Sequence, residues 1–138
     1  MSGDAAATTD RRQVFSTVPF TLLLGARREF SEGGRARLVL DARPELENML
    51  GAVHGGVLAT LLDVAMASAA VSKLDFTMTA VTLGMHTNFL HPGRGRLTAD
   101  GEVLGVDDGI ASCRARIVDD AGRLVAHGQG SFRYLPHR

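Results

Sequence analysis

The feature that most constrains this chain is a run of 17 residues, from Gly55 to Val71, in which Asp63 is the only charged residue. Ala and Leu dominate the run, and no proline interrupts it, so it predicts a helix of about five turns. Its apolar residues cover the whole circumference, which is typical of a helix enclosed by a sheet or a partner chain. We expect a core helix, because Thr60, Asp63 and Ser68 make the run too polar to cross a membrane.

A carboxylate in an apolar helix is costly unless it is paired, hydrogen-bonded or protonated. Asp63 has an ordinary interpretation as a cap, a partner for a distant arginine or a residue on a wetter edge. The functional interpretation rests on His54-Gly55-Gly56, which opens the same helix. Backbone N–H groups there lie at the positive end of the helix dipole, where an oxyanion can approach. A base or nucleophile plus an oxyanion donor is the minimum equipment for acyl transfer.

The spacing of these two elements constrains how they cooperate. Asp63 follows Gly56 by seven residues, which is about 10 Å along a helix that rises 1.5 Å per residue. One helix therefore cannot place both groups on a single carbonyl. We predict that Asp63 of one chain faces the glycine end of another chain, across a dimer interface.

Length, charge and cysteine content narrow the class of protein. A chain of 138 residues is expected to form one domain, predicted over 13–138 after a disordered tail over 1–12. Its 15 basic and 15 acidic residues cancel, so charge favours neither nucleic acid nor a membrane as a partner. The single cysteine, Cys113, excludes an internal disulfide and a cysteine zinc cluster, and its alternating context indicates a buried structural thiol. No secretion signal is found, which predicts a cytoplasmic protein.

The rest of the chain predicts an α+β domain, with one strand before the helix and four antiparallel strands after it, in a sheet that curls round the helix. Residues 14–24 fit a short helix or the start of a strand equally well. Two turns, at Asp107-Asp108-Gly109 and Asp119-Asp120-Ala121-Gly122, have hairpin chemistry. The predicted strands are Arg35 to Asp41, Ala80 to Leu90, Arg96 to Val106, Ile110 to Val118 and Arg123 to Leu135.

Asn48, His54-Gly55-Gly56 and Asp63, nine residues after the histidine, together resemble the signature of the hotdog-fold acyl-CoA thioesterases of the PaaI type, in the 4-hydroxybenzoyl-CoA thioesterase superfamily. The resemblance runs from about Gly33 to Leu135. It implies a hotdog fold, two chains that join their sheets edge to edge, and homotetramers built from two such dimers. It also implies an acyl-CoA substrate and no separate cofactor, since coenzyme A is part of the substrate.

The resemblance also implies roles for five residues. Asp63 matches the catalytic carboxylate, acting as general base or nucleophile, and the Gly55 N–H matches the donor that polarises the thioester carbonyl. Asn48 and His54 match positions on the other side of that site. Thr82 falls where similar enzymes have a serine or threonine that orients the attacking water.

Binding of coenzyme A is implied at the stretch from Phe89 to Arg94, with the turn from Gly105 to Ile110 and the last strand around Arg133 as the other candidates, and arginine suits its phosphates. The residues implied to bind the substrate are Gly56, Phe89, His91, Pro92, Arg94, Gly109, Ile110 and Arg133. A solvated rim is an equally good interpretation of the arginines beside the Gly93 turn. The turn at Asp107-Asp108 departs from the Lys or Arg that similar enzymes often have there. No metal site is expected, because no His-x-x-x-His motif is present.

Other functions on the same fold stay open at this point. A non-catalytic acyl-CoA-binding protein would keep the groove and lose the carboxylate, and a hydratase or dehydratase would place a histidine and a second acid differently. A purely structural oligomer would not need Gly55-Gly56 beside Asn48. The acyl group is not specified by the sequence, nor is the choice between coenzyme A and a carrier-protein thioester.

Overall fold

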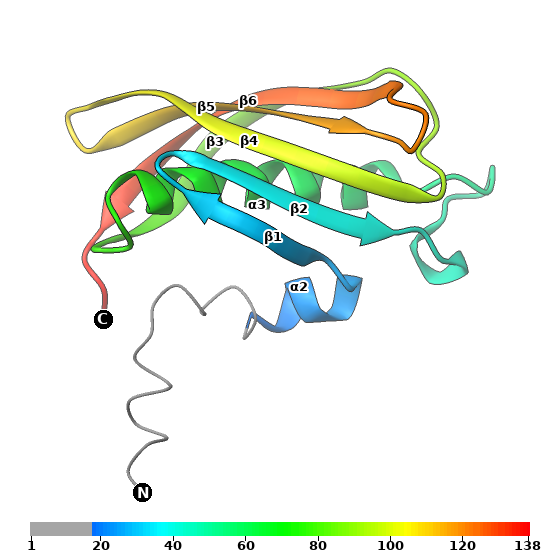
Figure 1. Ribbon diagram of the computed structural model, residues 1–138, viewed down its shortest axis with the longest axis horizontal. Coiled ribbons are helices and arrows are strands. Elements are labelled where there is room, and N and C mark those ends of the chain that lie inside the picture. The colour runs from blue at the N-terminus through cyan, green and yellow to red at the C-terminus, as the bar shows by residue number, and fades with distance from the viewer. Residues whose placement is uncertain (1–17) are drawn as a thin grey trace, which may run out of the picture.

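Six antiparallel strands form one curved sheet in the order β1-β2-β4-β5-β6-β3, and the long helix α3 lies against its inner face (Figure 1). The computed structural model describes residues 18–138, so the tail predicted over 1–12 lies outside the described residues. The elements are α2 (Pro19–Leu24), β1 (Arg27–Glu32), β2 (Arg35–Asp41), a 3-10 turn η2 (Pro44–Leu46), α3 (Gly55–Lys73), β3 (Thr79–Phe89), β4 (Arg96–Asp107), β5 (Ile110–Val118) and β6 (Leu124–Leu135).

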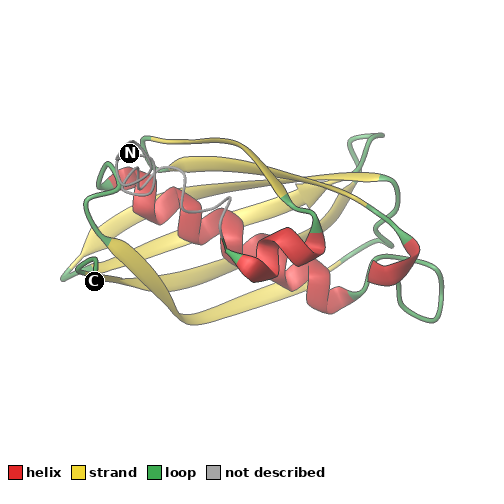
Figure 2. Cartoon of the chain, turned by 90° about the horizontal axis from the view of Figure 1, so that it is seen from below, coloured by secondary structure: helices red, strands yellow, loops and turns green. Residues whose placement is uncertain are grey.

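The central helix α3 has 19 residues, two more than predicted, and it contacts all six strands. Figure 2 shows it running obliquely across the concave side of the sheet. At Gly101 in β4, a Cβ atom would lie 2.5 Å from the Ala65 carbonyl oxygen, so only glycine allows this approach of strand and helix. The helix side chains buried against the sheet are Leu58, Leu61, Leu62, Ala65, Met66, Ala69, Ala70 and Ser72.

The sheet of the single chain does not enclose α3 on most sides, so enclosure by a partner chain, the other predicted alternative, stays a prediction. A stripe that includes Val57, Asp63, Val64, Ala67 and Val71 is only half-buried, because the sheet covers one side of the helix. The composition argument against a membrane span is wrong, since α3 is long and apolar enough to cross a membrane by those two criteria. Its packing against the strands, rather than its composition, identifies it as a core helix.

The segment before the first predicted strand holds two further elements. Residues 19–24 form the short helix α2, with Pro19 at its first position and Gly25 in a left-handed conformation after its end. The strand β1 was missed, so two strands precede α3 rather than one. Its sequence, Arg-Arg-Glu-Phe-Ser-Glu, lacks the apolar alternation that marks a strand with one buried face. Pairing with β2 forms it instead.

The strands after α3 follow the predicted order, and the α+β class is confirmed. Both predicted hairpin turns join neighbouring antiparallel strands, β4 to β5 and β5 to β6. Asp108 and Gly109 both have positive φ, as a tight hairpin requires. In β5 the buried and exposed residues alternate strictly, and Cys113 lies on the buried face. The strand β3 ends the sheet, so one of its two edges is unpaired among residues 18–138.

Candidate active site

Asp63 lies in the third turn of α3 and accepts a hydrogen bond from a residue of the edge strand. The Thr82 Oγ1 atom of β3 donates to Asp63 Oδ1 at 2.6 Å. This contact brings together two residues that the resemblance assigned to one site. Asp63 is half-buried and Thr82 is exposed in the single chain, so the expectation of a carboxylate sealed in a dry core is not met. With one oxygen held by the threonine, the second carboxylate oxygen is left for another ligand.

A bulge in β3 explains how both ends of that strand face the helix. Thr82 and Phe89 are seven residues apart, and an odd separation on a regular strand places side chains on opposite faces. The pairing with β6 shifts by one residue between Thr82 and Gly84. As a result Thr82 bonds Asp63 while the Phe89 ring lies 3.9 Å from where a Cβ atom on Gly55 would be. Bulges often re-aim side chains beside active sites.

The start of α3 presents one free amide. The His54 Nδ1 atom accepts a hydrogen bond from the Gly56 N–H at 2.8 Å, which places the proton of a neutral imidazole on Nε2. The Gly56 N–H is therefore occupied by His54, and the implied substrate-binding role of Gly56 stays a prediction. The Gly55 N–H has no hydrogen-bond partner among residues 18–138. It lies at the positive end of a 19-residue helix and is the donor available to an oxyanion.

Asn48 shapes the loop that leads into α3. Its Oδ1 atom accepts hydrogen bonds from the backbone N–H groups of Leu50 at 2.9 Å and Ala52 at 3.2 Å. Its Nδ2 group has no partner in the described part of the chain, yet it is not a buried orphan. The side chain thus uses its acceptor to fix the loop and keeps a donor for a ligand.

A hollow of about 380 Å³ lies beside the Gly55 amide. Six residues that the resemblance assigned to the site line it together, and they are Asn48, Gly55, Phe89, His91, Pro92 and Arg94. The His91 Nδ1 atom lies 2.8 Å from the Leu124 carbonyl oxygen, so this nitrogen is the donor and Nε2 is left free. Arg94 Nη1 donates to the Gly51 carbonyl oxygen at 2.5 Å and so ties the β3–β4 connection to the loop before α3.

The apolar part of this lining is Leu50, Ala52, Val53, Leu58, Leu90 and Gly93, of which Leu90 and Gly93 belong to the predicted stretch from Phe89 to Arg94 and the other four were missed. Leu58 alone had a signal, since it follows Gly55 by three residues on the same face of the helix. The others lie on loops that only the fold brings together. Arg96, which suits phosphate as well as Arg94 by its chemistry, is bound instead to Asp41 by contacts of 2.8 and 3.1 Å.

The remaining predicted substrate residues lie at the other end of β3. Arg133 pairs with Val81 on one side and with Ile110 on the other, and a Cβ atom on Gly109 would lie 3.9 Å from Arg133 Nη1. Gly109, Ile110 and Arg133 are therefore near Thr82 and not in the hollow beside Gly55. The predicted site is split into two groups along one strand.

The two groups are too far apart to act on one carbonyl within a single chain. Thr82 contacts Asp63, and Phe89 lies beside Gly55. These two residues of β3 are separated by roughly 20 Å, at about 3.3 Å per strand residue. The helix axis separates Gly55 from Asp63 by about 12 Å. The single chain holds the candidate base, Asp63, and the free Gly55 amide as two separate groups, which we call half-sites.

Comparison with known proteins identifies the family. The family model described as "Thioesterase superfamily" matches residues 50–126, which include α3 and both half-sites. A relative from Halobacterium salinarum with the name "Putative esterase" is 34% identical over 121 residues, covering 80% of either chain.

Two solved structures are similar over nearly the whole chain. A thioesterase family protein from Silicibacter pomeroyi has a TM-score of 0.85 at 26% identity and covers 92% of this chain and 96% of its own. The E. coli PaaI protein from the phenylacetic acid degradation operon has a TM-score of 0.84 and covers 94% and 93%. At 24% identity the PaaI likeness shows the fold alone. The chain therefore belongs to the thioesterase superfamily, adopts the hotdog fold and is a hydrolase of that superfamily.

Proposed function

We propose that this protein hydrolyses acyl-CoA thioesters, with Asp63 and Thr82 of one protomer acting together with the Gly55 amide of a second protomer. The observation that carries the proposal is the pair of half-sites on opposite ends of β3. One end holds a carboxylate oriented by a hydroxyl, and the other holds an unpaired helix-terminal N–H beside an apolar hollow. Neither half is sufficient for thioester hydrolysis alone.

Antiparallel pairing of two β3 edges would unite these halves. The point midway between Thr82 and Phe89 falls at Met85 and His86, so a two-fold axis there places Thr82 of one strand beside Phe89 of the other. Each Asp63 then meets the Gly55 amide of the opposite chain. Exposed apolar side chains along β3 support such a contact, since Val81, Leu83 and Phe89 are 43%, 53% and 51% exposed in the single chain. The half-buried stripe of α3 includes Asp63 itself, so it lies on the same side of the helix as the carboxylate.

The chemistry follows from the donors and acceptors present. Thr82 holds one oxygen of Asp63, and the other oxygen either deprotonates a water or attacks the thioester carbonyl itself. The oxyanion that forms accepts from the Gly55 N–H of the partner protomer and from the Asn48 Nδ2 group. Collapse breaks the carbon–sulfur bond. If water attacked, the acyl group leaves as the free acid and the thiolate of coenzyme A takes up the proton that Asp63 removed from the water. If Asp63 attacked, collapse leaves an anhydride on Asp63 and a thiolate that is protonated from solvent, and a water molecule then hydrolyses the anhydride to the free acid and the Asp63 carboxylate.

We propose that the same pairing of two β3 strands also forms the binding site for coenzyme A. Pairing of two β3 strands brings the Gly109, Ile110 and Arg133 group of one protomer to the hollow of the other, where His91 and Arg94 lie. Guanidinium groups on either side of the interface suit the phosphates. The apolar hollow suits an acyl chain or the pantetheine arm. Association of two such dimers into a tetramer is part of the same proposal.

A complementation experiment tests the shared site directly. Gly55→Pro removes the N–H and leaves the helix intact, because proline suits the first helical position and His54, at φ −59° and ψ 140°, has a backbone that a following proline accepts. Asp63→Asn removes the base. Each variant alone should be inactive in a thiol-release assay over a panel of acyl-CoAs. Mixed dimers, formed by co-expression, contain one site with both defects and one intact site.

The outcomes of this experiment are distinct. Restored activity in mixed dimers, absent from either parent, supports a site shared between protomers. Activity that stays at the parental level, with mixed dimers verified by tag-specific purification, would overturn the shared site. Binding of acyl-CoA without thiol release by the natural protein would instead identify a non-catalytic binding protein. Single-turnover hydrolysis in ¹⁸O-labelled water separates the two roles of Asp63. A general base sends the label into the free acid, whereas a nucleophile whose anhydride is opened at the Asp63 carbonyl takes the label into its own carboxylate.

A further inference from the structure

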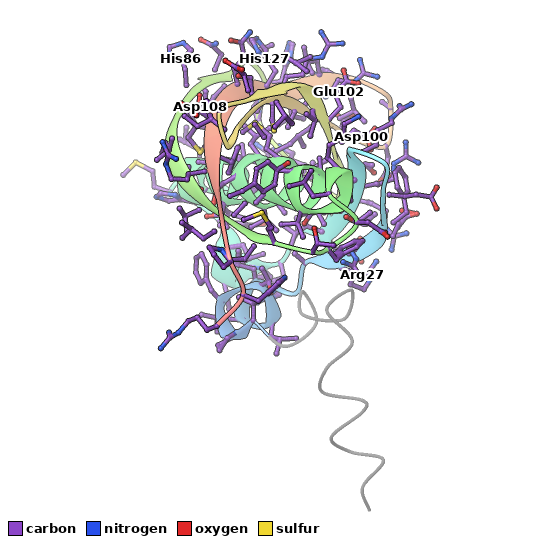
Figure 3. The ribbon with its side chains drawn as sticks, turned by 90° about the vertical axis from the view of Figure 1, so that its left-hand side faces the viewer. Arg27, His86, Asp100, Glu102, Asp108 and His127 are labelled. Carbon is purple, nitrogen blue, oxygen red and sulfur yellow. The ribbon has the colours of Figure 1, made fainter. Side chains whose placement is uncertain are left out.

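The convex face of the sheet, opposite α3, carries two rows of polar side chains that run across four strands. Figure 3 shows Asp100, Glu102 and His127 on this side of the sheet, away from the helix. The rows follow from strand register. One row is Arg35, Glu102, Arg114 and Gln129, and the other is Arg37, Asp100, Arg116 and His127. Together they form the floor of a groove of about 700 Å³, which we call the outer groove.

The outer groove has an excess of positive charge. Its lining has four arginines and two acidic residues, a net charge of +2 in a chain whose overall charge is zero. Both acids are already paired. Arg37 Nε lies 2.7 Å from Asp100 Oδ1, and Arg114 Nε lies 2.5 Å from Glu102 Oε1. Arg35 and Arg116 have no acidic partner among residues 18–138.

Polar side chains that can donate hydrogen bonds lie beside Arg116 at the β5–β6 end of the groove, while Asp100, paired with Arg37, lies opposite it on β4. Arg116 lies directly opposite His127, and Arg114 lies directly opposite Gln129. Opposed residues of antiparallel strands have Cβ atoms about 5 Å apart, and neighbours on the same face of a strand are about 6.6 Å apart. The four side chains therefore surround an area suited to one tetrahedral oxyanion, and two of them are guanidinium groups that bind phosphate oxygens well.

We propose that the outer groove binds the phosphoryl group of a small phosphorylated molecule, at Arg114, Arg116, His127 and Gln129. The groove lies on the far side of the sheet from Asp63 and Gly55, so this site is separate from the thioesterase site and does not depend on the proposed function. A second copy of the chain is a poorer occupant. Two such faces packed together would place eight arginines against four acids, and like charges would oppose the contact.

The far end of the groove offers a surface for the rest of the ligand. Phe30 of β1 lies opposite Arg37 in the second row, and the Arg37 guanidinium lies 5.5 Å from the centre of its ring. The ring is 40% exposed. From β5 to β1 the sheet spans three strand spacings, about 14 Å, which is a distance that a nucleoside diphosphate can cover but inorganic pyrophosphate cannot.

Binding is measured by isothermal titration calorimetry with two probes, ADP and inorganic pyrophosphate, at low ionic strength, and adenosine serves as the probe without phosphate. We expect both phosphate probes to bind and adenosine not to bind. In the double variant Arg116→Gln, His127→Gln the dissociation constants of both ADP and pyrophosphate should rise at least about tenfold. Arg27→Gln on β1 removes one charge far from the cluster and should leave binding unchanged. If the natural ligand is a nucleotide, Phe30→Ala should weaken the binding of ADP but not of pyrophosphate. If the natural ligand is a free polyphosphate, this variant should bind both probes as tightly as the natural protein does.

Three results would overturn the proposal. The first is unchanged binding in the double variant, once thermal unfolding shows that it is folded. The second is equal loss of ADP binding in Arg94→Gln, which would place the probe at the thioesterase site. The third is a smaller assembly of the double variant in sedimentation velocity, which would identify the groove as a contact between copies of the chain. Hydrolysis of acyl-CoA should be the same in the double variant and the natural protein.

Discussion

The two edges of the sheet differ in length, composition and what lies beside them. The edge strand β1 has six residues, four of which are charged, and a bulge interrupts its pairing with β2. The edge strand β3 has 11 residues and no charged residue other than a titratable histidine, and several of its large apolar side chains are exposed. Short, charged edges resist strand addition, whereas long apolar edges invite it, and the bulge does not distinguish the two edges because β3 has one as well. The comparison supports the proposal that a partner chain pairs with β3 rather than with β1.

Each edge also sends one hydroxyl group to α3, and the two acceptors differ. Ser31 of β1 donates to the Ser68 carbonyl oxygen at 2.9 Å, while Thr82 of β3 donates to the Asp63 carboxylate at 2.6 Å. The first contact ties sheet to helix through a backbone group. The second orients an acidic side chain. The β1 edge therefore supplies matched controls for experiments at the β3 edge.

The largest effect is expected at Asp63. Asp63→Asn keeps the shape of the side chain and its acceptor for Thr82 but removes the base, so kcat for acyl-CoA hydrolysis should fall about 10³-fold. The melting temperature should change little, because the side chain is half-buried. Asp41→Asn, which alters a carboxylate bound to Arg27 of β1, should retain full activity. A comparable loss of activity in Asp63→Asn and Asp41→Asn would contradict the proposed functional difference between the two edges.

The next largest effect is expected where two copies of β3 would cross. His86→Glu would place two carboxylates beside each other at the proposed axis, so the dimer dissociation constant should rise about tenfold or more. Activity should fall in parallel and recover at high protein concentration. Sedimentation velocity measures the dimer. The control is Glu29→Lys on β1, and a dimer weakened by that variant but not by His86→Glu would reverse the comparison.

A smaller effect is expected from the two hydroxyl groups. Thr82→Ala should lower kcat about tenfold with little change in KM, because Asp63 loses its orienting donor. Ser31→Ala should leave kcat unchanged and lower the free energy of unfolding by about 1 kcal/mol. Steady-state kinetics and urea denaturation of both variants provide the measurements. An unchanged rate in Thr82→Ala removes Thr82 from the site.

The smallest effect is a change in stability at alkaline pH, and it is expected at Cys113 in the middle of the sheet, away from both edges. Burial raises the pKa of the Cys113 thiol to about 11 from an ordinary value of 9.0. A raised folded-state pKa means that stability is retained below about pH 9 and declines as the pH rises toward 11. Native protein at pH 8 should resist iodoacetamide, with labelling only after denaturation, as followed by mass spectrometry. Cys113→Ala should flatten the alkaline decline, and rapid native labelling would contradict the buried state.

The sequence predicted the elements whose signal is local. The apolar run of α3, the two Asp-Gly type turns and the alternation of β5 all identify structure from neighbouring residues, and each is confirmed. The strand β1 was missed because it has charged residues on both faces and therefore lacks the alternation of apolar and polar residues that predicts a strand. Its existence depends on pairing with β2, which is a tertiary effect.

The candidate site was predictable in its residue types but not in its geometry. The spacing of His54-Gly55-Gly56 and Asp63 predicted two groups that one helix cannot unite, and the separate half-sites agree with that. The occupation of the Gly56 amide by His54 was not predictable, because it depends on one side-chain rotamer. The bulge after Thr82 was also hidden, although Gly84 is the kind of residue that accompanies one.

The absence of a side chain at Gly101 has a consequence far from β4. This contact fixes the height of α3 above the sheet at Ala65, only two residues from Asp63 but ten residues, about 15 Å, from Gly55. Any larger residue at position 101 would push α3 away from the sheet at Ala65, and the displacement would reach the carboxylate of Asp63 before it reached the amide of Gly55.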